Sequence, residues 1–252
     1  MKIAVTGANG QMGQNVIKKA REEGIKISVA FDREEGESRG LKVHSDENIA
    51  ELILQNDVDF MVDFTVPEAT INYVEAAVET STPLVIGTTG FSDSQLETIK
   101  SAGDEVPILK ASNFSPCINV MKDLVREAAD QLEEYDIEVT ETHHDRKRDA
   151  PSGTAKMLLE EIKKVRDTEE VHGRKGKAPR DEKEVGVHAR RAGDIKGEHE
   201  VLMAGNEEVF KIKHRSESRE VFASGALTAG EWLINQENGF YSFSDALKRE
   251  ES

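Results

Sequence analysis

Residues 2–13 read Lys-Ile-Ala-Val-Thr-Gly-Ala-Asn-Gly-Gln-Met-Gly, and the N-terminal half of the chain is organised around this stretch. Its apolar start, Lys2 to Thr6, predicts a buried strand, and the apolar spacing from Met12 to Ala20 predicts a helix. Glycines at Gly-x-x-Gly-x-x-Gly spacing connect these two elements. A strand, a glycine turn and a helix in this order are typical of a parallel sheet with helices packed on both faces.

The glycine turn is also a candidate binding site for a dinucleotide. Glycines let the backbone approach a pyrophosphate, and a helix start offers N–H groups that have no partner within the helix. A tight turn would use the same glycines without any ligand, but the position of the motif between a strand and a helix favours a cofactor. We therefore predict a Rossmann-type domain with cofactor contacts from Gly7, Gly10, Gln11, Met12 and Gly13.

The second predicted strand, Lys26 to Phe31, ends at Asp32-Arg33. An acid at this point can accept hydrogen bonds from ribose hydroxyls, whereas an arginine can pair with a 2′-phosphate. Because both are present, we expect tolerance of NADH and NADPH, with Asp32 and Arg33 as cofactor-binding residues. The alternative is a surface ion pair in a charged loop from Arg33 to Arg39.

The parallel pattern continues through three further predicted strands that end in small or hydroxyl-bearing residues. The strands are expected at 59–65, 83–86 and 106–111, with helices at 46–55 and 67–79. Gly87-Thr88-Thr89 follows the second of these strands, and Ser112-Asn113-Phe114 follows the third. Because ligands bind at the carboxyl edge of such sheets, the small residues and hydroxyls of Gly87-Thr88-Thr89 make that segment a candidate cofactor contact.

A second stretch that carries chemistry runs from Glu138 to Thr154. A strand-like alternation is followed by His143, His144 and Lys147, and then by a Pro-Ser-Gly-Thr turn that opens a predicted helix. Histidine titrates near neutrality, lysine can supply a proton, and a helix N-terminus favours a carboxylate. The stretch therefore indicates acid catalysis beside an anion cradle, although a solvated basic loop has a similar composition.

The order His-His-x-x-Lys-x-Asp-Ala-Pro-Ser-Gly-Thr, from His143 to Thr154, resembles the dihydrodipicolinate reductase (4-hydroxy-tetrahydrodipicolinate reductase) family. Gly-Thr-Thr-Gly at 87–90, Asn-Phe-Ser at 113–115 and Arg-x-Gly-x-x-x-Gly-x-His at 191–199 match further segments of that family. The resemblance implies that NADPH or NADH reduces a cyclic dicarboxylate, 4-hydroxy-tetrahydrodipicolinate, to tetrahydrodipicolinate in lysine and diaminopimelate biosynthesis.

The same resemblance implies roles for individual residues. Lys147 would be the general acid, with His143 as its partner or a competing donor, and His144 would hold the substrate. One substrate carboxylate would be bound by the turn at the helix start, formed by Ser152, Gly153 and Thr154. The segments 87–89 and 112–114 would lie on the nicotinamide side of the cofactor.

The resemblance also implies two domains. Residues 1–114 and 220–252 would form the dinucleotide-binding domain, and 115–219 an α+β domain with a mixed sheet that binds substrate and forms a homotetramer. In this second domain we expect helices at 118–132 and from 155 to about 165, and strands at 185–191, 199–204 and 208–214. A charged segment at 166–184 is expected to be a mobile loop, and Cys117 a small buried side chain.

Composition narrows the function classes. A net charge of −16 argues against general affinity for nucleic acid or an acidic membrane surface, and fits either simple solubility or adaptation to a salty cytoplasm. The chain has one cysteine, so no intramolecular disulfide can form, and no residue spacing suggests a metal site. No signal peptide or bilayer-spanning run is apparent, so we expect a cytoplasmic protein.

Two other functions are compatible with parts of the sequence. One is a Rossmann oxidoreductase that acts on a different imino or keto dicarboxylate. The other is a nucleotide-sensing module, which would need the glycine turn but would have no use for His143, Lys147 and the turn at Ser152 in their combined order.

Overall fold

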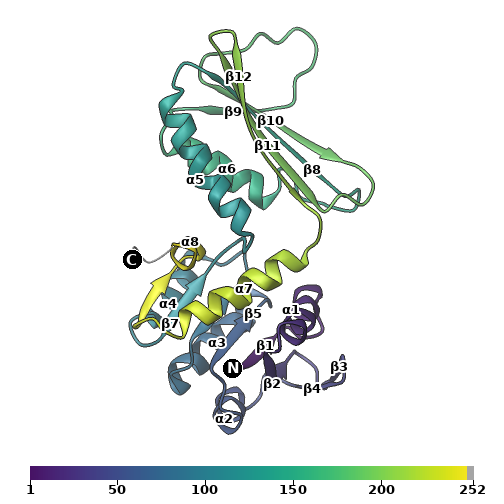
Figure 1. The fold of residues 1–252 in the computed structure, drawn as a ribbon, viewed down its shortest axis with the longest axis vertical. Coiled ribbons are helices and arrows are strands. Elements are labelled where there is room, and N and C mark those ends of the chain that lie inside the picture. Colours follow the sequence, from purple (N-terminus) through teal and green to yellow (C-terminus); the bar gives the residue numbers. More distant parts are fainter. Residues whose placement is uncertain (249–252) are drawn as a thin grey trace. The chain divides into compact units, whose positions relative to one another are not determined.

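The computed structural model describes residues 1–248, which divide into two compact units. The first unit consists of Met1–Ser115 together with the chain from Arg219 onward, and the second is Pro116–Ser218. The chain therefore passes between the units twice, once after Ser115 and once after Ser218 (Figure 1).

The first unit contains an eight-stranded sheet with the order β13-β7-β6-β5-β1-β2-β4-β3. Neighbouring strands pair in parallel except β3 and β4, which are antiparallel. The strand order reverses between β1 and β5, and such switch points form ligand-binding crevices at the carboxyl ends of the strands. The strands are β1 (Lys2–Thr6), β2 (Lys26–Phe31), β3 (Gly36–Ser38), β4 (Leu41–His44), β5 (Phe60–Asp63), β6 (Leu84–Ile86), β7 (Pro107–Lys110) and β13 (Gly239–Tyr241).

Helices cover both faces of this sheet. Alternate residues of β1 enter different cores: Ile3 and Val5 pack with the helices of one face, and Ala4 packs with those of the other. This explains why the central strands are apolar throughout. The first face is covered by α1 (Gln11–Glu22), α7 (Glu220–Leu233) and α8 (Phe243–Leu247), and the second by α2 (Ile49–Gln55), α3 (Pro67–Thr80) and α4 (Asp93–Ala102).

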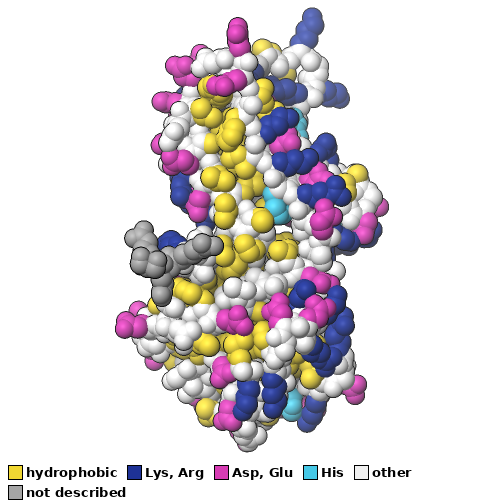
Figure 2. All heavy atoms as spheres, in the orientation of Figure 1, with side chains coloured by type: hydrophobic (Ala, Val, Ile, Leu, Met, Phe, Trp, Pro, Cys, Tyr) yellow, Lys and Arg dark blue, Asp and Glu magenta, His cyan; other side chains and the backbone are white. Residues whose placement is uncertain are grey.

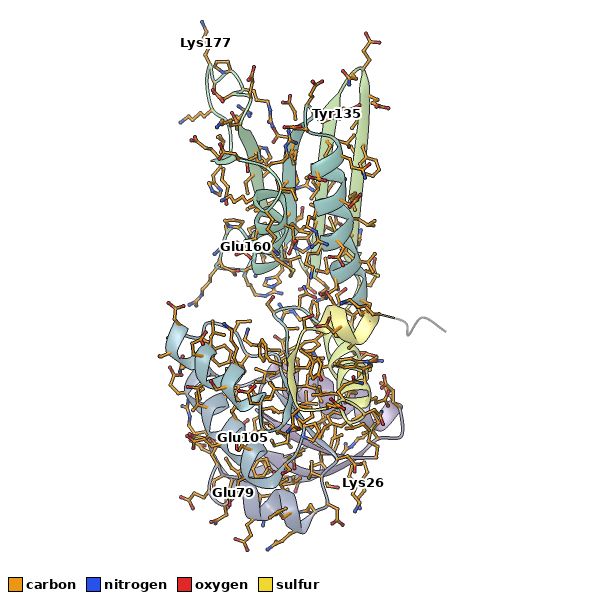
Figure 3. The ribbon with its side chains drawn as sticks, turned by 90° about the vertical axis from the view of Figure 1, so that its left-hand side faces the viewer. Lys26, Glu79, Glu105, Tyr135, Glu160 and Lys177 are labelled. Atoms are coloured by element: carbon orange, nitrogen blue, oxygen red, sulfur yellow. The ribbon has the colours of Figure 1, made fainter. Side chains whose placement is uncertain are left out.

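The second unit contains the mixed sheet that the sequence predicts. Its order is β12-β11-β8-β10-β9, and β8 pairs in parallel with β10 but antiparallel with β11. Two helices, α5 (Pro116–Gln131) and α6 (Gly153–Lys163), cover one face, where they pack on Ile137, Val139 and Val201 (Figure 3). The strands are β8 (Asp136–His143), β9 (Glu169–His172), β10 (Glu184–Arg191), β11 (Gly197–Gly205) and β12 (Glu208–Ser216).

Several sequence-based expectations were wrong in detail. The charged loop at 33–39 contains β3, and the segment at 166–184 contains β9, because both short strands gain backbone partners from β4 and β10. The rest of that second segment is tied to the sheet by Arg180, whose Nε lies 2.8 Å from Asp136 and which donates to the Ile137 carbonyl at 3.0 Å. Cys117 is exposed rather than buried.

Helix boundaries differ less. The helix expected at 46–55 begins at Ile49. Four further elements, β4, α4, β13 and α8, were not predicted at all. Among the helices of residues 1–248, none combines the length and apolarity needed to cross a bilayer.

Candidate active site

The glycine turn after β1 is shaped by close packing. Gly7 has φ +68°, and a Cβ there would lie 2.7 Å from the Phe64 carbonyl oxygen. A Cβ on Gly13 would lie 2.1 Å from the carbonyl oxygen of Gly7. The backbone therefore needs glycine at both positions, which is the arrangement that lets a pyrophosphate approach a helix start.

A cavity of about 450 Å³ opens beside this turn. Four of the predicted cofactor residues line it: Gly7, Gly10, Asp32 and Arg33. The Asp32 carboxylate is fixed there by backbone groups, since it accepts from the N–H of Asn9 at 2.8 Å and from that of Arg33 at 2.8 Å. The cavity thus has the size of a ligand site and a lining that mixes polar and apolar residues, as one end of a dinucleotide requires.

Asp63, at the end of β5, was given no individual role from the sequence. Its fully buried carboxylate accepts hydrogen bonds from four threonine hydroxyls at 2.6–2.7 Å. These come from Thr6, Thr65, Thr70 and Thr88, so one side chain joins the ends of β1 and β5, helix α3 and the turn after β6. The recurrence of threonine after successive strands was the available signal.

The remaining predicted cofactor residues have varied settings. The Thr88 hydroxyl is engaged by Asp63, and the Phe114 side chain is buried in the core beside Phe64 and Phe243. These two residues can therefore offer mainly their backbone to a ligand. Gln11 and Met12 lie in the first turn of α1, and Gly87 lies against the Phe64 ring. Thr89 and Ser112 are exposed. The Asn113 side chain accepts a hydrogen bond from the Ser115 N–H at 2.8 Å.

In the second unit, the predicted catalytic stretch is organised around Glu141 of β8. One carboxylate oxygen lies 2.5 Å from His143 Nδ1, and the other accepts from the Ser152 N–H at 3.1 Å. Arg191 donates to both oxygens, each at 2.9 Å. Burial would raise the pKa of Glu141, but the hydrogen bonds from His143 and Arg191 outweigh it and lower the pKa to about 2.

Ser152 is the N-cap of α6. Its hydroxyl accepts from the Ala155 N–H at 3.2 Å and lies 3.2 Å from His199 Nε2. Burial, and then the charge of the neighbouring His143, lowers the pKa of His199 to about 3, so His199 is neutral at working pH. Its ring meets that of His143 edge to face, with centroids 5.2 Å apart.

Lys147 lies in the loop between β8 and α6. Its side chain is 22% exposed, and Nζ forms an ion pair with Asp149 at 2.8 Å. The backbone oxygen of Asp149 accepts from Arg191 at 2.6 Å, which ties this loop to the Glu141 cluster. His144 is partly exposed, and its carbonyl accepts from the Lys147 N–H at 3.2 Å.

The structure thus gathers His143, Lys147 and the start of α6 at one end of the mixed sheet. Gly153 and Thr154 form the first turn of α6, and the space around the Gly153 Cα is open. Proton donors next to a helix N-terminus can protonate a reacting group and bind a carboxylate. Within residues 1–248, no group of three or more His, Cys, Asp or Glu side chains is arranged to hold a metal ion.

The partners that complete this cluster, Glu141, Arg191 and His199, were given no role from the sequence. Glu141 precedes His143 by two residues on a strand, so the two side chains share a face, and this spacing was a usable signal. Arg191 and His199 come from β10 and β11, and their approach depends on the order of strands in the sheet.

Comparisons with known proteins cover both units. The family model "Dihydrodipicolinate reductase, N-terminus" matches residues 1–114, and "Dihydrodipicolinate reductase, C-terminus" matches 117–247. A 4-hydroxy-tetrahydrodipicolinate reductase of Haloarcula marismortui is 46% identical over 98% of both chains, and one of Natronomonas pharaonis is 44% identical over 98% of this chain and 100% of its own. The solved dipicolinate-bound dihydrodipicolinate reductase from Paenisporosarcina sp. TG-14 superposes with a TM-score of 0.81 at 24% identity, covering 96% of this chain and 97% of its own.

Proposed function

Because this chain belongs to the dihydrodipicolinate reductase family, we propose that the loop after β8 and the glycine turn after β1 carry its reaction. The reaction is reduction of 4-hydroxy-tetrahydrodipicolinate to tetrahydrodipicolinate, with loss of water, in lysine and diaminopimelate biosynthesis, and the reductant is NADPH or NADH. The observation that carries the assignment of residues is the grouping of His143, Lys147 and the start of α6 at one end of the mixed sheet.

The proton donor follows from the chemistry. The bound cofactor supplies a hydride to carbon, and the negative charge that this leaves must be protonated. Lys147 is the proposed general acid, because Asp149 at 2.8 Å holds its ammonium group at the loop that ends at α6. His143 is its partner or a competing donor.

The substrate is a dicarboxylate, and the start of α6 suits one of its carboxylates. Ser152 already uses its N–H on Glu141 and its hydroxyl as the helix cap. We therefore assign the carboxylate contact chiefly to the first turn that follows, Gly153 and Thr154, with Ser152 setting the direction of that turn. His144, which is partly exposed on the same loop, is the proposed second substrate contact.

The first unit is the proposed cofactor-binding domain. Gly7, Gly10 and Gly13 allow the backbone approach described above, and Asp32 and Arg33 line the adjacent cavity. Asp32 offers carboxylate oxygens to ribose hydroxyls, and Arg33 offers a cation to a 2′-phosphate. We therefore expect both cofactors to be used.

The decisive experiment follows reduced-nicotinamide absorbance with NADPH and with NADH while the substrate is generated in place from pyruvate and aspartate semialdehyde by the preceding synthase. Oxidation that requires the synthase supports the proposed reaction and ranks the two cofactors. Cofactor binding without oxidation would point to another imino or keto dicarboxylate. Failure to bind either cofactor would contradict the assignment of the glycine turn.

We also propose that the chain forms a homotetramer through the sheet of the second unit and works in the cytoplasm. Edge strand β12 is largely exposed, with Val209 at 59% and Phe210 at 46%, and Figure 2 shows hydrophobic side chains gathered over the α5 and β12 region. Exposed apolar patches of this kind favour association. Light scattering should give the mass of four chains, and Phe210→Glu should lower this mass.

The proposed location in the cytoplasm rests on the cysteine count, because a chain with a single cysteine suits a reducing compartment.

A further inference from the structure

We propose that Glu141 is a positioning residue for the reduction: it holds His143 and the carboxylate-binding turn at Ser152 in one fixed arrangement, with Arg191 as its counterion. The inference rests on the proposed function, because it assigns a role in that same reaction. It does not require Glu141 to touch the substrate.

The hydrogen-bonding capacity of the carboxylate is fully used. One oxygen receives Ser152 N–H and one Arg191 nitrogen, and the other receives His143 Nδ1 and a second Arg191 nitrogen. The Glu141 side chain is 0% exposed, so an unpaired charge there would be costly. The two parallel bonds from Arg191 balance this charge and fix the plane of the carboxylate.

This arrangement sets the tautomer of His143. A carboxylate only accepts hydrogen bonds, so Nδ1 carries a proton and Nε2 is the ring atom left to exchange a proton with a ligand. Gly197 leaves room beside that atom, because a Cβ at this position would lie 3.1 Å from Nε2. Without the carboxylate, the ring could turn over or protonate the other nitrogen.

The same carboxylate directs the start of α6. Ser152 is held at three points: its N–H by Glu141, and its hydroxyl by the Ala155 N–H and His199 Nε2. These contacts fix the position of Ser152, and the position of Ser152 sets the direction of the N–H groups in the next turn of α6. One buried charge therefore fixes the proton-exchanging ring and the proposed carboxylate site together.

The alternative is that Glu141 and Arg191 form only a structural ion pair between β8 and β10. Backbone pairing from Val185 opposite Ile137 to Arg191 opposite His143 already joins these strands. A structural pair would affect folding but would have no special dependence on His143. The two roles can therefore be separated by coupling measurements.

The test compares wild type, Glu141→Gln, His143→Gln and the double variant in the synthase-coupled assay. We expect Glu141→Gln to lower kcat about 100-fold, within the range of general acid–base effects, with the KM for NADPH unchanged. Adding Glu141→Gln to His143→Gln should lower kcat by much less than Glu141→Gln alone does, because residues that act as a unit are not additive, and the remaining loss reflects the turn at Ser152.

Glu161→Gln is the matched control. Glu161 is also a buried glutamate of the second unit, at 4% exposure, and is paired with Arg126 at 3.1 Å and Lys164 at 2.7 Å. Neither of these partners is a proposed site residue. The kcat of the Glu161→Gln variant should therefore stay within about twofold of wild type.

The inference would be overturned if the kcat losses of the two single variants multiply in the double variant, or if Glu141→Gln keeps the wild-type kcat. Should Glu141→Gln fail to fold, Arg191→Lys replaces it, because lysine keeps the charge but cannot make the two-bond clamp. The same non-additivity with His143→Gln is then expected, and multiplying losses would again overturn the proposal. A wild type that oxidises neither nicotinamide would refute the proposed function and this inference with it, whereas an active wild type with multiplying losses refutes the inference alone.

Discussion

Lys147 is the residue on which the proposed proton transfer depends. Replacing Lys147 with alanine removes the ammonium group but leaves the glycine turn of the other unit untouched. We expect kcat to fall by about 100-fold or more, since general acid catalysis is worth that much, while the Kd for NADPH stays within about twofold. Coupled kinetics and calorimetric titration of NADPH measure the two effects separately.

Lys163→Ala is a suitable control, because this lysine lies at the other end of α6 and pairs with Glu170 at 2.6 Å. Its kcat should match wild type. Near-normal turnover in Lys147→Ala together with a collapse of NADPH affinity would show that the proposed role of Lys147 is wrong.

His199 gives the fold a pH dependence. Burial, followed by the charge of His143, lowers the pKa of His199 to about 3, whereas an unfolded histidine takes up its proton at about 6.5. Between these values the unfolded chain binds more protons, so stability falls as the pH falls from about 6.5 towards 3. His199→Gln, which stays neutral, should lose part of this slope, on the order of 3 kcal/mol over the range.

Urea unfolding midpoints at pH 4 to 7 measure the slope. His172→Gln serves as the control, because the His172 side chain is 54% exposed. A slope that is identical in wild type, His199→Gln and His172→Gln would contradict the proposed contribution of His199.

At the residue scale, catalytic roles could be assigned from the sequence to residues of one contiguous stretch, but not to the residues that complete the cluster from other strands. His143, His144, Lys147 and the turn at 152–154 lie in one stretch whose chemistry can be read directly. Arg191 is 50 residues from Glu141, and His199 is 47 residues from Ser152, so only the pairing of β8 with β10 and β11 brings them together. Roles that depend on strand order could not be deduced from local spacing.

At the element scale, strands and helices with strong apolar periods were predicted well. β2 was expected at 26–31 and is found at Lys26–Phe31, and the mixed sheet of the second unit is confirmed. β3 and β9 were missed because they are short and polar. They exist because β4 and β10 offer backbone partners, which is a tertiary effect that propensity does not encode.

The join between β1 and α1 allows a sharp test of element packing. In Gly13→Ala the new Cβ would lie 2.1 Å from the backbone oxygen of Gly7, so the strand and helix would have to move apart. We expect a loss of about 3 kcal/mol in stability, together with weaker NADPH binding, because the same turn is the proposed pyrophosphate site. Thermal unfolding and cofactor titration measure both.

Gly36→Ala in β3 is the matched control, since no atom lies within 4 Å of its Cβ position. Its stability should remain within about 0.5 kcal/mol of wild type. Equal stability of the two variants would mean that helix α1 can shift without cost, and that close packing does not explain Gly13.

At the scale of the whole molecule, charge is the dominant feature. The chain carries 49 acidic and 33 basic side chains, which leaves a net charge of −16. Many basic groups are already engaged in surface ion pairs, such as Lys196 with Asp194 and Lys248 with Asp245. The surplus acids therefore repel one another, and this repulsion favours the unfolded chain.

Salt should relieve that repulsion. At 1 M ionic strength the Debye length is about 3 Å, so long-range repulsion is screened, whereas the exposed ion pairs that weaken at the same time are each worth at most about 1 kcal/mol. We expect the Tm to rise by about 3 °C or more between 0.1 and 2 M KCl, and activity to be retained. Sucrose at equal osmolality is the control, because it is excluded from the surface but screens no charge. If the Tm rises equally in sucrose, the effect comes from exclusion of the solute from the protein surface and not from charge. If neither the Tm nor the activity changes with KCl, the acidic surface serves solubility alone.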